Sequence, residues 1–179
     1  WHTPQEDEIA LAMDCGISPY LMLAFHMRQD IYGRFYDPRD MTEAERTIWK
    51  GSLMRLIQKL TIRKNRPVVL KSPSHTYRVA TLLEMFPDAK FVYIYRDPYA
   101  VYNSSMHLRH TMFAENSLYP SQPEGSEDEM VMMYEKCIRT YEATKSMIPA
   151  GNLHELRYED LELNPLGEVA QTYKALGLS

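Results

Sequence analysis

Apolar residues recur every three or four positions in several stretches of the chain, a pattern typical of amphipathic helices. The two longest stretches run from Thr42 to Leu60 and from Ser126 to Ile148, and each opens with the Ser/Thr-x-x-Glu signature of a capping box. Residues 29–40 and 109–126, rich in turn-forming residues, are predicted to be loops. Shorter helices are predicted to begin near Thr3, Ser18, Ser74, Asp97 (this one ending near His107) and Asn164.

Three short runs rich in β-branched and aromatic residues predict strands at 67–70, 91–95 and 153–157. The run at 91–95 shows no alternation of polar and apolar residues, so we expect it inside a sheet, covered on both faces. Residues 67–95 have the length of one right-handed βαβ unit. Strands that alternate with helices predict an α/β fold with a mainly parallel sheet flanked by helices.

Composition narrows the class of protein. The 179 residues suit a single domain, 1–179, with a mainly helical part at 1–64 and an α/β part at 65–179. A net charge of −4 argues against a general nucleic-acid binder, and no apolar run approaches the ~20 residues of a membrane span. Two cysteines, Cys15 and Cys137, are too few for a disulfide framework and predict free thiols in a cytoplasmic protein.

Each predicted strand ends in a polar group that includes a lysine or an arginine. Lys71, Arg96 and Arg157-Tyr158 follow the three runs, and the carboxyl ends of parallel strands share one edge of a sheet. Cations there, together with helix N-termini, predict an anion site; solvated strand-end charges are the alternative. None of the seven glycines forms a G-x-x-x-x-G-K-[ST] or G-x-G-x-x-G phosphate loop.

Several motifs together carry a family resemblance. They are Leu70-Lys71-Ser72-Pro73-x-His75, Phe86-Pro87-Asp88-Ala89, Arg96-Asp97-Pro98 followed by Ser104, Arg157-Tyr158-Glu159-Asp160-Leu161, and the acidic stretch 4–8. In this order they resemble the sulfotransferases that use 3'-phosphoadenosine-5'-phosphosulfate (PAPS), and most of all their bacterial-type branch. The resemblance implies a P-loop-like three-layer fold, sulfuryl transfer to an acceptor hydroxyl or amine, and an acceptor side formed by 1–64.

The resemblance also implies roles for single residues. Arg96 and Ser104 match the clamp that holds the 3'-phosphate of the co-substrate, which suits a bidentate guanidinium and a hydroxyl donor. Tyr158 matches a residue beside the adenine, where an aromatic face can stack. Lys71 matches a lysine near the transferred sulfuryl group, where a cation stabilises charge that develops on the bridging oxygen.

The sequence identifies the general base less clearly than the donor-binding residues. His75, four residues after Lys71, could accept the acceptor proton. Other sulfotransferase branches carry a His two residues after this Lys, where this chain has Pro73, or use a Glu. Glu6, Glu8 and a residue upstream are therefore open alternatives, although Glu6 is also predicted to cap the first helix from its N3 position. We expect no metal, and interpret His107-x-x-His110 as helix-end histidines.

The family's 5'-phosphosulfate loop, which normally precedes these motifs, is not in the sequence. We therefore expect a fragment truncated at both ends, which lacks part of the donor site. A P-loop kinase or NTPase relative and a non-catalytic binding module on the same scaffold are the alternative functions. The acceptor is a small molecule, a glycan or a lipid rather than nucleic acid, and the sequence leaves its identity and the oligomeric state open.

Overall fold

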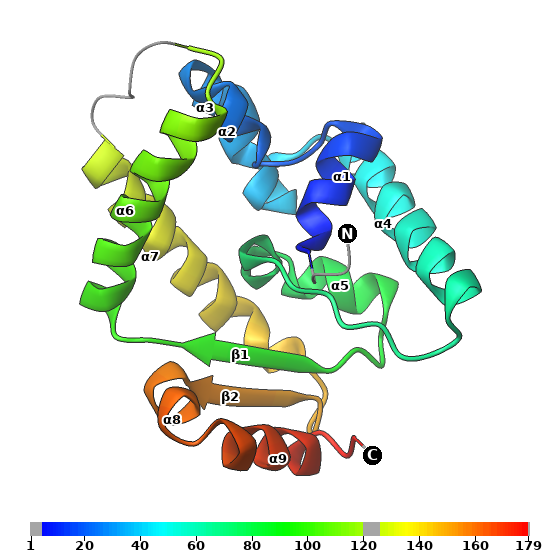
Figure 1. The fold of residues 1–179 in the computed structure, drawn as a ribbon. Coiled ribbons are helices and arrows are strands. Elements are labelled where there is room, and N and C mark those ends of the chain that lie inside the picture. The colour runs from blue at the N-terminus through cyan, green and yellow to red at the C-terminus, as the bar shows by residue number, and fades with distance from the viewer. Residues whose placement is uncertain (1–4, 120–125, 179) are drawn as a thin grey trace. The chain divides into compact units, whose positions relative to one another are not determined.

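The computed structural model describes residues 5–119 and 126–178 (Figure 1). By their internal contacts these residues divide into two compact units. The helical unit holds 5–78 and 110–119, and the sheet unit holds 79–109 and 126–178. The single-domain organisation expected from the chain length stays a prediction.

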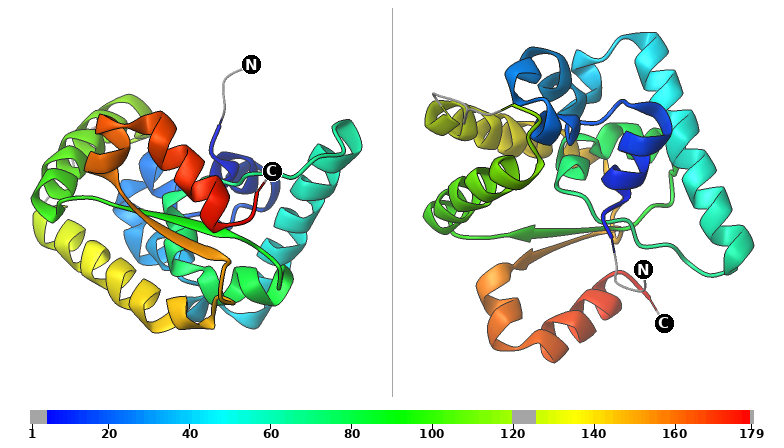
Figure 2. Two further views of the ribbon diagram at one scale, coloured as in Figure 1. Left: turned by 90° about the horizontal axis from the view of Figure 1, so that it is seen from below. Right: turned by 45° about the horizontal axis from the view of Figure 1, so that its top comes forward.

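The helical unit is built around a 21-residue helix, α4 (Glu43–Arg63). The predicted capping box is confirmed, because the Thr42 hydroxyl accepts the Glu45 amide while the Glu45 carboxylate accepts the Thr42 amide. Helix α1 (Asp7–Cys15) packs against α4 and ends at Gly16, whose φ of 69° suits glycine (Figure 2). Short helical segments complete the unit: α2 (Leu21–Ala24), α3 (Gln29–Tyr32), and 3-10 turns at His26–Arg28, Gly33–Tyr36, Pro38–Asp40 and Pro73–Tyr77.

Several predictions in this unit were wrong. The segment 29–40, expected as a loop, folds into consecutive helical turns. Ser74 does not cap a helix: the Ser72 hydroxyl accepts the Ser74 amide and starts the 3-10 turn Pro73–Tyr77. The α-helix itself, α5 (Val79–Met85), follows in the sheet unit. The predicted start at Thr3 lies outside the described residues.

The sheet unit contains two parallel strands, β1 (Phe91–Tyr95) and β2 (Leu153–Arg157), paired from Phe91 with Leu153 to Tyr95 with Arg157. Helices α6 (Pro98–Asn116) and α7 (Ser126–Thr144) and the 3-10 turn Lys145–Met147 lie between them in sequence. Helices α8 (Tyr158–Leu163) and α9 (Pro165–Ala175) follow β2, as Figure 1 shows. The described residues therefore form a mixed fold of helices with a small parallel sheet, as the α/β prediction requires.

One face of this sheet carries the core of the unit. Tyr93 of β1 stacks on Tyr141 of α7 at 3.8 Å between ring centroids, and the Tyr141 hydroxyl donates to Glu155 of β2. On the other face α9 lies against β2, whereas Val92 and Ile94 of β1 remain 46% and 49% exposed. The expectation that 91–95 is covered on both faces was wrong, because an unbroken apolar run cannot distinguish one covered face from two.

The predicted strand at 67–70 does not form. These residues have no regular structure, and Val69 is 92% exposed. The predicted βαβ unit at 67–95 is therefore absent, and β1 pairs with β2 instead. A short β-rich run becomes a strand only where a neighbouring strand satisfies its backbone, and Pro67 also lacks an amide donor.

Helix α6 continues to Asn116, nine residues beyond its predicted end near His107. His107 and His110 consequently lie inside the helix, so their interpretation as helix-end histidines was wrong. Between Leu108 and Asn116 the sequence contains neither Gly nor Pro, and the polar residues there do not stop a helix. The predicted loop 109–126 is correspondingly shorter, and its segment 120–125 lies outside the described residues.

Candidate functional site

Arg96 and Tyr158 are neighbours because of the register of the sheet. Tyr95 pairs with Arg157, so the residues that follow them leave the sheet side by side. The Arg96 guanidinium lies over the Tyr158 ring, 4.4 Å from its centroid. Arg96 is exposed and Tyr158 is half-buried, and Arg96 has no carboxylate partner among residues 5–119 and 126–178. The guanidinium thus keeps its N–H edges available to an anion while the ring supports its face.

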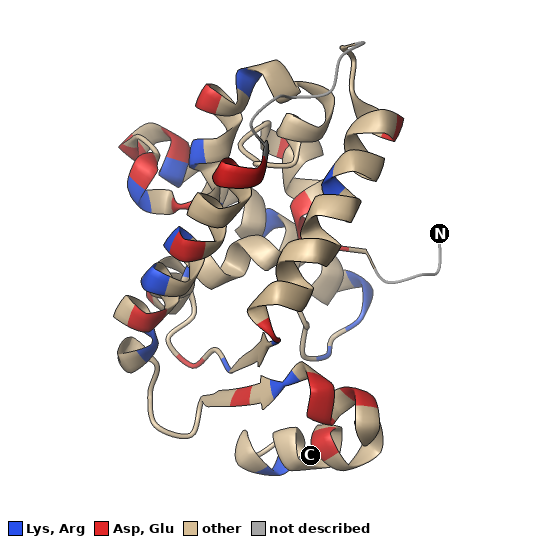
Figure 3. Cartoon of the chain, turned by 90° about the vertical axis from the view of Figure 1, so that its left-hand side faces the viewer, with Lys and Arg blue, Asp and Glu red and all other residues tan. Residues whose placement is uncertain are grey.

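The residues that follow Arg96 and Tyr158 in the sequence also interact. The Asp97 amide donates to Glu159 Oε1 at 3.1 Å, and Asp97 Oδ1 accepts the Ala100 amide at 2.9 Å, which caps α6 as predicted. The Asp97 amide, with the Arg157 guanidinium, lowers the pKa of Glu159. Figure 3 shows the acidic residues at the start of α8 beside the basic strand end. At this edge Arg157 is therefore paired with Glu159, whereas Arg96 is a cation without an acidic partner among the described residues.

Ser104 lies on α6, seven residues after Asp97 and on the same side of the helix, about 10 Å further along its axis. Its side chain is exposed and forms no hydrogen bond with Arg96 or Tyr158 in the described part of the chain. The structure thus brings Arg96 and Tyr158 together but does not join Ser104 to them. The phosphate clamp stays a prediction for Ser104.

The remaining predicted residues lie in the helical unit, where three consecutive acids meet three bases. Glu6 pairs with Lys71, Asp7 with His75, and Glu8 with Arg78. Three residues of the segment 71–78 thus each pair with one acid at or just before the start of α1. Lys71 follows no strand, because residues 67–70 have no regular structure, so its expected place at a strand end was wrong.

Glu6 binds two groups at once. One carboxylate oxygen accepts Lys71 Nζ and the other accepts the Tyr20 hydroxyl. Burial of the Tyr20 ring and its hydrogen bond to Glu6 both raise the pKa of the Tyr20 hydroxyl. Glu6 is the residue preceding α1, not its N3 residue, and its side chain forms no cap hydrogen bond. The predicted capping role of Glu6 was therefore wrong.

Glu8 belongs to the interior of the unit. Its carboxylate and the Arg78 guanidinium are both 0% exposed, and Arg78 Nη1 lies 2.6 Å from Glu8 Oε2. Arg78 also donates to the Phe35 carbonyl at 2.8 Å and lies over the Trp49 ring. A carboxylate held by a guanidinium in a fully buried ion pair is not available to accept a proton, which argues against Glu8 as the base.

Asp7 and His75 form a buried pair whose side chains are 6% and 14% exposed. His75 Nε2 lies 2.9 Å from Asp7 Oδ2. His75 Nδ1 and Asp7 Oδ1 are also buried, and neither has a hydrogen-bond partner among the described residues. Our sequence reasoning did not single out Asp7; the run of three acids, matched by Lys71, His75 and Arg78 at helical spacing, was the available signal.

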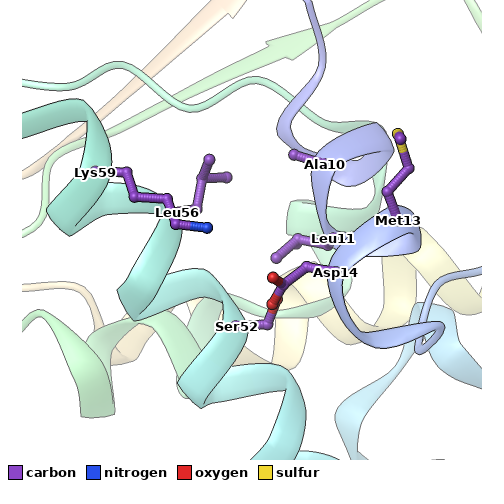
Figure 4. Close-up of a pocket in the computed structure, with 7 residues that line it drawn as sticks. All are labelled: Ala10, Leu11, Met13, Asp14, Ser52, Leu56 and Lys59. Carbon is purple, nitrogen blue, oxygen red and sulfur yellow. The ribbon is translucent and has the colours of Figure 1, made fainter. Parts of the chain in front are cut away.

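A cavity of about 330 Å³ lies between α1 and α4 (Figure 4). Asp14 and Ser52 point toward each other across it, with Ser52 Oγ 2.6 Å from Asp14 Oδ2. The hydrogen bonds from Ser52 and Arg55 lower the pKa of Asp14. The other residues that line the cavity are Ala10, Leu11, Met13, Leu56 and Lys59.

Within the described residues, no group of three or more His, Cys, Asp or Glu side chains could hold a metal ion. Among the same residues, no helix combines the length and apolar character that crossing a membrane requires.

Comparisons with known proteins define the class. A profile described as "Sulfotransferase family" matches residues 12–179. The chain therefore belongs to the sulfotransferase family, as its motifs indicate. Membership favours the sulfotransferase hypothesis over the kinase or NTPase alternative.

Two curated relatives carry the same name, omega-hydroxy-beta-dihydromenaquinone-9 sulfotransferase Stf3, one from Mycobacterium bovis and one from Mycobacterium tuberculosis. Each is 38% identical over 177 residues, which cover 99% of this chain and 46% of the relative. The chain thus spans about half the length of these relatives. No solved structure matches it significantly.

Proposed function

We propose that this chain carries the donor-binding and proton-accepting residues of a PAPS-dependent sulfotransferase with a P-loop-like three-layer fold. The observation that carries the proposal is the Arg96 guanidinium on the Tyr158 ring, at the carboxyl ends of two parallel strands. Family membership and 38% identity to curated sulfotransferases support it.

On the donor side, Arg96 and Ser104 hold the 3'-phosphate and Tyr158 flanks the adenine. The residues present fit that group: the ring supports one face of the guanidinium, and the N–H groups of Arg96 remain available for phosphate oxygens. Because Arg96 covers one face of Tyr158, the adenine stacks on the other face or beside the ring.

On the transfer side, Lys71 stabilises charge and His75 is the general base. His75 accepts the proton of the acceptor hydroxyl as its oxygen bonds to sulfur, while the bond from sulfur to the bridging phosphate oxygen breaks. Lys71 stabilises the negative charge that grows on that leaving oxygen. In the structure Lys71 is paired with Glu6, so when Lys71 binds the anionic phosphosulfate of the donor it exchanges one anionic partner for another.

For the acceptor we propose a lipid hydroxyl. The curated relatives are named for a hydroxylated menaquinone derivative, and their identity to this chain covers almost all of it. For the location we propose the cytoplasm, because neither Cys15 nor Cys137 forms a disulfide among the described residues.

Calorimetric titration of the natural full-length protein with adenosine 3',5'-bisphosphate tests the donor site. We expect Arg96→Ala to weaken binding by about 1.5–3 kcal/mol, the scale of a charged hydrogen bond. Arg139→Ala is the matched control, because Arg139 is an exposed arginine of the same unit that pairs with Glu135 on its own helix. Equal affinity for adenosine 5'-phosphate and for the bisphosphate would contradict the clamp.

A further inference from the structure

The contact between Asp7 and His75 determines which nitrogen of the imidazole carries the hydrogen. An ionised carboxylate only accepts hydrogen bonds, so Asp7 Oδ2, 2.9 Å from Nε2, requires a hydrogen on Nε2. In the neutral ring, Nδ1 then carries the lone pair. A base with a fixed tautomer presents one defined atom to its substrate.

The remaining atoms of the pair point to a ligand. His75 Nδ1 is buried and lacks a hydrogen-bond partner in the part of the chain that the structure describes. An unsatisfied buried acceptor is unfavourable, and a hydrogen-bond donor supplied by a ligand is one way to satisfy it. A hydroxyl group is a donor that would satisfy this lone pair, and it is the group from which a sulfotransferase must remove a proton.

We propose that Asp7 is the positioning residue of the general base: it holds His75 with the hydrogen on Nε2, so that Nδ1 receives the proton of the acceptor hydroxyl. This inference rests on the proposed function. It adds a residue, Asp7, that forms no part of the motif roles described above, and it specifies the reactive nitrogen.

The surrounding charges support the assignment of Asp7 to this task. The acids on either side, Glu6 and Glu8, are paired with Lys71 and Arg78. The carboxylate that faces His75 is thus that of Asp7. Asp7 is the first residue of α1 and His75 lies in the 3-10 turn Pro73–Tyr77, so both side chains come from ordered segments that the two flanking ion pairs hold together.

Nitrogen-15 NMR of histidine-labelled protein tests the tautomer directly. The chain has six histidines, and a His75→Gln variant identifies the His75 signals by their loss. For the wild-type protein near neutral pH we expect the hydrogen on Nε2. In Asp7→Asn the new amide can donate to Nε2, which moves the ring hydrogen to Nδ1. A hydrogen on Nδ1 in the wild type would overturn the proposal.

Kinetics separate positioning from folding. With PAPS and a long-chain prenyl alcohol as acceptor, we expect Asp7→Asn to lower kcat about 100-fold or more, with KM changed less than about threefold. Asp7→Glu keeps a carboxylate, which only accepts hydrogen bonds, and its kcat should be at least tenfold higher than that of Asp7→Asn. Asp30→Asn is the control, because Asp30 is an exposed carboxylate of the same unit paired with Arg28.

The outcomes distinguish this proposal from the proposed function. If the wild type transfers no sulfuryl group, the proposed function fails, while the NMR measurement still decides the tautomer. If it is active and Asp7→Asn retains wild-type kcat, Asp7 is not a positioning residue. If Asp7→Asn does not fold, the wild-type tautomer and the activity of Asp7→Glu decide whether Asp7 is a positioning residue.

Discussion

The Arg78 guanidinium donates to both carboxylate oxygens of Glu8, at 2.6 and 3.3 Å, with neither side chain exposed. The same guanidinium lies over Trp49, itself 1% exposed, and bonds the Phe35 carbonyl. One arginine thereby joins α1, α4 and the turn Gly33–Tyr36. Because an unpaired buried charge is costly, packing of the helical unit that separates Glu8 from Arg78 is disfavoured.

Removing one member of this pair should destabilise the protein strongly. We expect Glu8→Ala to cost about 3–5 kcal/mol of unfolding free energy, because it leaves the Arg78 charge buried without its partner. Arg78→Lys should cost a similar amount, since lysine lacks the planar fork that meets the carboxylate and the Trp49 ring. Urea denaturation measures both. Arg28→Ala breaks the exposed pair with Asp30 and should change stability by less than about 1 kcal/mol.

Tyr158 should contribute to donor affinity through its ring, not its hydroxyl. We expect Tyr158→Ala to weaken binding of adenosine 3',5'-bisphosphate by about 1–3 kcal/mol, the scale measured for a base stacked on an aromatic side chain. Tyr158→Phe keeps the ring that supports Arg96 and should bind nearly as wild type. Calorimetry on the two variants checks this, and equal losses in both would mean that the hydroxyl, not the ring, matters.

Glu6→Gln separates two roles of Glu6. If Glu6 only neutralises Lys71, its loss leaves the ammonium group available to the donor, and we expect affinity for PAPS to rise about two- to fivefold with kcat retained. If Glu6 were the base, kcat would fall about 100-fold or more. Steady-state kinetics with varied donor distinguish these outcomes. Glu43→Gln, an exposed acid at the start of α4, serves as the control.

Stability should decrease in acid as the Glu45 carboxylate becomes protonated. The hydrogen bonds from Arg34 and from the Thr42 amide lower the pKa of Glu45 from 4.5 to about 2. A carboxyl group with a depressed pKa stabilises the folded state above its unfolded pKa, and this contribution disappears as pH falls from about 5 to 2. After solvent screening we expect about 1–2 kcal/mol. Thermal melts of Glu45→Gln should show a weaker dependence on pH across this range than the wild type.

Local signals in the sequence predicted much of the sheet unit. The Asp97 cap, the Asn164 cap and the strand 153–157 all rest on side chains within a few residues of the element they define. The proximity of Arg96 and Tyr158 followed from the expectation that the carboxyl ends of parallel strands lie at one edge of the sheet.

The helical unit was less predictable, because distant pairings determine its structure. The acids at 6–8 meet partners more than sixty residues away, and no local pattern shows that Asp7 contacts His75. The same is true of 67–70, whose composition favours a strand although no neighbouring strand is there to pair with it. Helical periodicity indicates which face is apolar, but it does not reveal which polar residues meet across the interior.

The one-to-one matching of the acids 6–8 with Lys71, His75 and Arg78 constrains how relatives of this protein can be recombined. A chimaera that takes its first helix from one parent and the segment 71–78 from another keeps three compatible bonds only if both parents share the same order of charges. A single-residue insertion among the acids would move at least one acid out of register with its base. Crossover points for such chimaeras should therefore be chosen so that the first helix and the segment 71–78 come from the same parent.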